Sequence, residues 1–338
     1  MRRRETTRWA AAGCGLGLLV VGLAIVLLAA VALPFEGCDF EFGPSDACTD
    51  HDDGLIAAAS SGDADELRER LANGADPNRP TEGVTLLSCA VANHHADAVV
   101  ALLEAGATPT TQHLVDATYS GDTAIARFLL EAGAPIETRV LTAAAGDGGT
   151  SHRPFSGAPV KAGTPDELLT IATLVLERGG DPNGATEGPK PLLFAAYNGR
   201  ESMVALLLAH GSDPNTGGQV GADLVRFAQL ATPDSELYPP LSGPMVANVP
   251  PIVAATWIGQ LAISTRLLDA GADPNLAADE AFTALYAASL RGDSPMVELL
   301  LARGADPVPV VRPGVMTPAE VARAANHPNT ARLLDAHQ

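Results

Sequence analysis

The sequence predicts an all-α solenoid of about eight helix-turn-helix units, preceded by one N-terminal transmembrane helix. Two observations predict the solenoid. A phrase close to Gly-Ala-Asp-Pro-Asn recurs seven times, and an amphipathic run precedes every copy. The phrase is complete at residues 74–78 and 271–275, and near copies contain Gly106, Gly133, Gly180, Gly211 and Gly304. In the copy that contains Gly180, the outer-turn glycine from which positions are counted is Gly179. A third observation, an uncharged apolar run near the N-terminus, predicts the transmembrane helix.

Each copy of the phrase is typical of a helix end followed by a turn. Glycine adopts the left-handed conformation without steric conflict, proline cannot continue a helix, and Asp and Asn favour turns. A second glycine stands twelve residues earlier in most units, with His94 in its place in the second unit, and a short Ala-rich run precedes it. Each unit is therefore expected to contain a short first helix, an inner turn, a longer second helix and an outer turn.

The second helices share one apolar face. A leucine stands three residues before the glycine of the outer turn in all seven copies. Further apolar residues stand four and seven or eight residues before that glycine, with Arg70 of the first unit as the polar exception. Spacings of three and four place these side chains on one side of a helix.

The repeated pattern resembles the ankyrin repeat, whose unit has about 33 residues. The resemblance rests on the outer-turn phrase and on residues 85–90 (Thr-Leu-Leu-Ser-Cys-Ala), 191–196 (Pro-Leu-Leu-Phe-Ala-Ala) and 283–288 (Thr-Ala-Leu-Tyr-Ala-Ala). It implies an ankyrin repeat domain at residues 53–338 that binds a protein partner. The histidine of the family's Thr-Pro-Leu-His motif is interpreted as absent throughout, so irregular hydrogen bonding between repeats is expected.

The last unit is expected to form a C-terminal cap. Thr317 has the character of an N-cap residue, Pro318 suits the first helical position, and Glu320 stands three residues after Thr317.

Two insertions interrupt the spacing. The steps between outer-turn glycines are 32, 27, 46, 32, 60 and 33 residues. The first excess lies at about 148–165, between the two helices of the fourth unit. The second lies at about 216–249, between an outer turn and the next first helix, and its residues 222–230 are helix-competent. Insertions in repeat proteins map to loops, often on the binding face.

The N-terminal region is expected to anchor the chain in a lipid bilayer. Residues 9–35 carry no charge, and about 20 apolar residues span a bilayer, so they predict an uncleaved signal anchor. Four arginines in residues 1–8 and carboxylates after residue 35 place the basic tail in the cytoplasm and the repeats outside the cytoplasmic membrane. Cleavage after the Ala-Val-Ala at residues 30–32, giving a secreted or periplasmic binder, is the alternative.

Residues 36–52 form an acidic juxtamembrane linker with two cysteines, Cys38 and Cys48. Outside the cytoplasm, the expected pairing is a disulfide between these two, which closes a small loop. A metal site that includes His51 is the alternative, although the spacing matches no known ligand pattern.

The charge argues against a nucleic-acid partner. The net charge is −19, and residues 1–8 contribute +3, so the remainder carries −22. Nucleic-acid binding needs a basic footprint. Lys161 and Lys190 are the only lysines, which is typical of a GC-rich bacterial genome.

The sequence contains no phosphate-binding loop, HExxH, GxSxG or CxxC pair. We therefore expect no enzyme activity, cofactor, metal or small-molecule substrate. The alternative, an enzyme, depends on Cys89 with His94, which are interpreted as a packed core cysteine and a turn residue.

One repeated position is a candidate for partner binding. Large side chains stand two residues before the inner-turn glycine, at Tyr119, Tyr197, Trp257 and Leu290. A row of exposed aromatic side chains is typical of a protein-binding surface. The alternative is that these side chains pack over neighbouring helices and shield the core. The sequence thus predicts a membrane-displayed scaffold that binds an unidentified protein.

Overall fold

The computed structural model describes residues 48, 54–80, 84–146, 162–184, 190–220, 246–278, 282–308 and 316–338. The expected cytoplasmic tail, signal anchor and most of the linker lie outside these ranges. Within them, none of the helices combines the length and hydropathy that a membrane span requires.

The helices of the described ranges form eight pairs, which we number units 1 to 8. The pairs are α2 (Gly54–Ser61) with α3 (Ala64–Ala72), α4 (Leu86–Ala92) with α5 (Ala96–Glu104), α6 (Thr111–Ser120) with α7 (Thr123–Glu131), α8 (Thr138–Ala145) with α9 (Pro165–Glu177), α10 (Pro191–Tyr197) with α11 (Glu201–Ala209), α13 (Pro251–Ile258) with α14 (Leu261–Asp269), α15 (Ala284–Arg291) with α16 (Ser294–Ala302), and α17 (Pro318–Ala324) with α18 (Pro328–Asp335).

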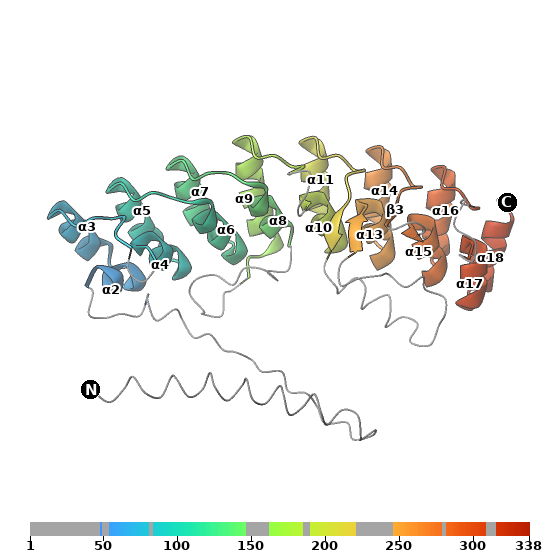
Figure 1. The fold of residues 1–338 in the computed structure, drawn as a ribbon, viewed down its shortest axis with the longest axis horizontal. Helices are drawn as coiled ribbons and strands as arrows, with labels where there is room; N and C mark the ends of the chain where they lie inside the picture. The colour runs from blue at the N-terminus through green and yellow to red at the C-terminus, as the bar shows by residue number, and fades with distance from the viewer. Residues whose placement is uncertain are drawn as a thin grey trace, which may run out of the picture. The chain divides into compact units, whose positions relative to one another are not determined.

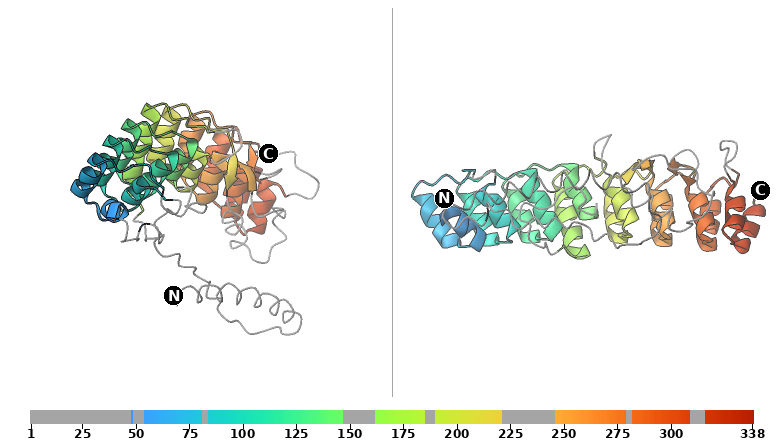
Figure 2. Two further views of the ribbon diagram at one scale, coloured as in Figure 1. Left: turned by 60° about the vertical axis from the view of Figure 1, so that its left-hand side comes forward. Right: turned by 60° about the horizontal axis from the view of Figure 1, so that its bottom comes forward.

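The units stack in chain order (Figures 1 and 2). Each first helix contacts the first helix of the next unit, and the second helices form a matching layer. The predicted array of eight helix pairs is therefore present in the described part of the chain.

Small residues allow the first helices to pack closely. Four residues before the inner-turn residue stands an alanine in seven of the eight units and Thr142 in unit 4, and all eight are buried. In the second helices, the apolar residue four before the outer-turn glycine is almost fully buried, as in Leu102 and Leu207, whereas Arg70 of unit 1 is exposed. The two layers thus enclose one continuous core.

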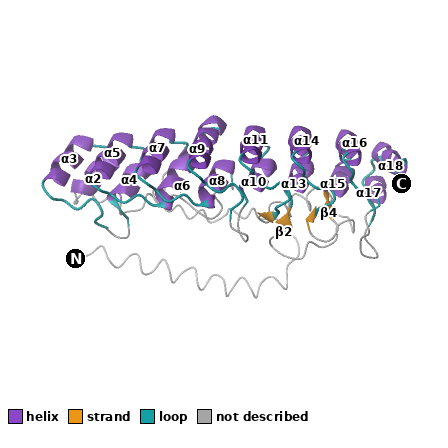
Figure 3. Ribbon diagram, turned by 90° about the horizontal axis from the view of Figure 1, so that it is seen from above, coloured by secondary structure: helices purple, strands orange, loops and turns teal. Residues whose placement is uncertain are grey.

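Four short strands add to the helices, so the expectation of an all-α fold is incomplete. Strands β1 (Gly218–Val220) and β2 (Val246–Val249) pair antiparallel, as do β3 (Ala277–Ala278) and β4 (Phe282–Thr283). Strand β2 also contacts β3. Figure 3 shows β2 and β4 beside α13 and α15.

The insertions stand where the spacing places them. The first separates α8 from α9, and the second begins and ends in the paired strands β1 and β2. Most residues of both insertions, including the helix-competent run at 222–230, lie outside the described ranges.

The C-terminal unit has the predicted cap. The Glu320 amide donates to Thr317 Oγ1 at 3.3 Å, and the Thr317 amide donates to Glu320 Oε2 at 2.7 Å. The hydrogen bond from the Thr317 backbone lowers the pKa of Glu320. Arg323 Nη2 lies 2.5 Å from Asp335 Oδ1 and joins α17 to the end of α18.

Candidate functional site

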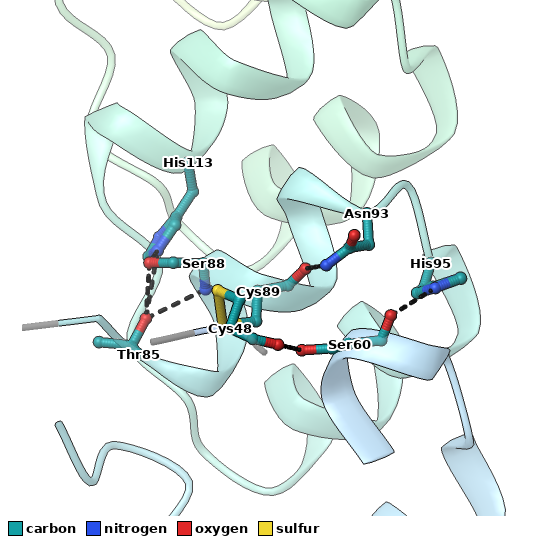
Figure 4. The surroundings of a disulfide bond; sticks show 8 residues. All are labelled: Cys48, Ser60, Thr85, Ser88, Cys89, Asn93, His95 and His113. Carbon is teal, nitrogen blue, oxygen red and sulfur yellow. Dashed lines mark hydrogen bonds between the residues drawn. A yellow bond between two sulfur atoms is a disulfide. The ribbon is translucent and has the colours of Figure 1, made fainter. Parts of the chain in front are cut away.

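A disulfide joins the segment before the first unit to the second unit. Cys48 bonds Cys89 of α4, with a Cα–Cα distance of 5.6 Å and a sequence separation of 41 (Figure 4). The expected pairing of Cys48 with Cys38 is therefore wrong, and Cys38 lies outside the described residues. The reason is tertiary: stacking brings α4 alongside α2, and residue 48 lies against both helices.

Polar contacts at the end of α2 hold the Cys48 backbone beside the disulfide. Cys48 and Cys89 are only 7% and 1% exposed. The Ser60 hydroxyl donates to the Cys48 carbonyl at 2.8 Å. The Ser60 carbonyl in turn accepts from Nε2 of His95, at the start of α5, at 2.9 Å. The segment at Cys48 is thus joined to both unit 1 and unit 2 (Figure 4).

This pairing removes Cys89 as a nucleophile. Its sulfur carries no thiol while bonded to Cys48, and thiolate is the reactive form. Nδ1 of His94 lies 2.5 Å from Asp122 Oδ2 of the next unit. The metal alternative likewise loses Cys48 as a ligand, and no group of three or more metal-binding side chains occurs among the described residues.

A serine–histidine pair lies beside the disulfide but is oriented as a structural contact. His113 Nε2 lies 2.9 Å from Ser88 Oγ. The Thr110 amide donates to Nδ1 of His113 at 3.0 Å, so Nδ1 is the acceptor and Nε2 carries the proton. Nε2 therefore donates to Ser88 and does not accept its proton as a general base would.

His113 corrects the interpretation that the family histidine is absent. Thr110 caps α6, and His113 completes a capping box with it, in the order Thr110-Thr111-Gln112-His113. Through Ser88, the same ring reaches the preceding unit. Burial lowers the pKa of His113 to about 4, so the ring is neutral at pH 7.

The four side chains of the proposed row differ in exposure. Tyr119 and Tyr197 are half-buried, whereas Trp257 and Leu290 are each 7% exposed. The Trp257 ring contacts the Phe282 ring of β4 edge-on, with ring centroids 5.4 Å apart. The ring centroids of Phe282 and Tyr286 are 5.5 Å apart. At the last two positions, then, the side chains shield the core, as the alternative interpretation expects.

Asparagine side chains connect the outer turns of neighbouring units. Asn215 Nδ2 donates to the Gly271 carbonyl at 3.1 Å, and its Oδ1 accepts from the Asp273 amide at 2.8 Å. The same pair of bonds is made by Asn78, Asn183 and Asn275. Thr110 and Glu137 stand at the equivalent positions after Gly106 and Gly133, so asparagine is missing there.

Family models of the ankyrin repeat match three stretches of the chain. A model of three ankyrin repeats matches residues 55–140, and a single-repeat model matches residues 190–218 and 282–309. No curated protein matches the chain. The chain therefore contains ankyrin repeats, and these repeats indicate a protein–protein interaction module.

Proposed function

We propose that this chain is a protein-binding scaffold without catalytic activity, displayed on the outer side of the cytoplasmic membrane and anchored by residues 9–35. The binding role follows from the ankyrin repeats. The outward display is supported by the Cys48–Cys89 disulfide, since disulfides persist in oxidising compartments and are rare in the cytosol. The uncharged run and the arginines before it support the anchor and its orientation.

The thiol state in intact cells tests the display. A full-length variant with Cys14→Ser and Cys38→Ser keeps only Cys48 and Cys89. We expect a mass-shifting maleimide to label neither cysteine after rapid quenching and denaturation, and to label both after reduction. The matched control is the same variant without residues 1–35, retained in the cytoplasm, where both thiols should react directly. Direct labelling of the anchored chain would reject the outward display.

The partner surface is proposed to include Tyr119 and Tyr197, the two half-buried members of the row. Both belong to first helices, α6 and α10, and tyrosines that combine an apolar ring with a polar end are frequent in binding surfaces.

Site-specific photo-crosslinking tests this surface. A photoreactive residue at position 197 should give one discrete cross-linked species in living cells. The matched control is position 202 in the second helix of the same unit, where Ser202 is exposed. If both positions gave the same cross-linked species, or if position 197 gave none, Tyr197 would be rejected as part of the partner surface.

A further inference from the structure

The second helix of unit 1 buries few side chains in the core. This helix, α3, buries only Leu67, whereas α5 of unit 2 buries Ala98, Val99, Ala101 and Leu102. Among the described helices, unit 1 contacts a neighbouring unit on one side only, through α4 and α5. A unit with few apolar contacts at the end of an array is where local unfolding begins.

The disulfide encloses this unit completely. Cys48 precedes α2, and Cys89 lies in the middle of α4, so both helices of unit 1 lie within the loop that the bond closes. A cross-link restricts the unfolded state of the residues that it encloses, and residues outside the loop are not restricted.

Two hydrogen bonds near the disulfide join Cys48 to unit 1 and unit 1 to unit 2. The Ser60 hydroxyl holds the Cys48 carbonyl, and His95 holds the Ser60 carbonyl from the start of α5. With these bonds and the disulfide, Cys48 joins the end of α2 to the middle of α4.

We propose that the Cys48–Cys89 disulfide is a clasp that keeps unit 1 folded on unit 2, and that breaking it releases unit 1 while the other units stay folded. Reduction by a dithiol transfers two electrons and two protons to the two sulfurs, giving two thiols, and the dithiol becomes a cyclic disulfide. Because Cys89 is only 1% exposed, the dithiol can reach the disulfide only after the contact between units 1 and 2 has opened. The proposal goes beyond partner binding and concerns how the array is held together.

Hydrogen–deuterium exchange of the purified full-length protein, oxidised and then reduced, tests the clasp. Peptides that cover α2 and α3 should exchange roughly 100-fold faster after reduction. Peptides that cover α15 and α16 should not change. Mass spectrometry of alkylated cysteines confirms that the bond is broken in the reduced sample.

Two variants complete the test. Cys48→Ala leaves Cys89 as a small buried side chain and should reproduce the effect of reduction, whereas Cys38→Ala keeps the bond and should behave as the unaltered protein. Unchanged exchange of α2 and α3 after verified reduction would overturn the proposal, and so would a comparable increase in all units. The exchange experiment starts from purified protein in which the disulfide is already formed, so its outcome does not depend on the compartment in which the chain resides. Failure of the clasp is therefore distinguishable from failure of the outward display, which the thiol labelling in cells tests.

Discussion

The two edges of the array use glycine in the same conformation for different reasons. In unit 3, Gly121 of the inner turn and Gly133 of the outer turn have φ values of 76° and 81°. A β-carbon at Gly121 would lie 2.6 Å from Gly163 Cα, whereas one at Gly133 would meet nothing within 4 Å. The other inner-turn glycines are likewise covered by a residue of the next unit, and the other outer-turn glycines are open.

This difference shows how neighbouring units are joined at each edge. At the inner turns, a side chain of the next unit packs over the glycine and often donates to the preceding helix end. Arg291, for example, packs over Gly259 and donates to the Trp257 carbonyl at 3.0 Å. At the outer turns, asparagine side chains make hydrogen bonds from one turn to the next and leave the glycines uncovered. Neighbouring units are thus joined by side-chain packing at the inner turns and by asparagine hydrogen bonds at the outer turns.

Substitution of the two unit 3 glycines gives the largest predicted effect. Gly121→Ala adds a side chain to a left-handed residue and also displaces the Gly163 backbone, whose amide donates to the Tyr119 carbonyl at 2.9 Å. We expect it to lower the free energy of unfolding by about 3 kcal/mol, against about 1 kcal/mol for Gly133→Ala. Urea unfolding followed by circular dichroism measures both. Equal losses would show that the inner-turn contact adds nothing.

A fall in pH should weaken the contact between units 2 and 3, where the outer-turn asparagine is missing. The pKa of His113 is about 4 in the folded protein, below its ordinary value of 6.5, so the unfolded chain binds the proton more tightly. The stability that neutral His113 contributes is therefore complete above pH 6.5 and is lost as the pH falls toward 4. Between pH 7 and pH 5 the loss is about 2 kcal/mol.

His113→Gln is the matched control for the pH dependence, since glutamine does not titrate. Its unfolding free energy should be lower at pH 7 because the capping box is disturbed, but it should fall less than that of the unaltered protein between pH 7 and pH 5. Parallel pH profiles would contradict the role assigned to His113.

Removal of an outer-turn asparagine should give the smallest effect. Asn215→Ala removes two exposed hydrogen bonds to unit 6 and should lower the unfolding free energy by about 1 kcal/mol. Asn215→Asp keeps the acceptor for the Asp273 amide and loses the donor to the Gly271 carbonyl, so its loss should be intermediate. A loss as large as that of Gly121→Ala would mean that the outer edge is joined as tightly as the inner one.

The local pattern of the sequence predicts the array well. The repeated glycines mark both turns, and Thr317 with Glu320 forms the expected cap, because these features depend on residues close in the chain. His113 was missed for a local reason. Helix α6 begins farther from its inner-turn glycine than the first helices of the other units do, so counting back from Gly121 passes over the histidine. The order Thr110-Thr111-Gln112-His113 was the available signal.

The remaining errors come from contacts between distant residues. The pairing of Cys48 with Cys89 depends on how two units stack, and nothing near either cysteine in the sequence indicates it. Likewise, Trp257 shares a repeat position with Tyr197, but only Trp257 is covered by Phe282 of β4, the strand that leads into unit 7. Repeat position therefore predicts which helix face a side chain occupies, and the neighbouring unit decides whether it is exposed.

The disulfide also determines how a mechanical load would enter the array. Tension applied to the N-terminus reaches Cys48 and then follows the shortest covalent path, which crosses the sulfur–sulfur bond to Cys89 in α4. The helices of unit 1 lie in the loop beside this path and carry no tension while the bond is intact. The terminal unit, which is the easiest to unfold, is thus shielded from a pulling force, and unit 2 receives the load.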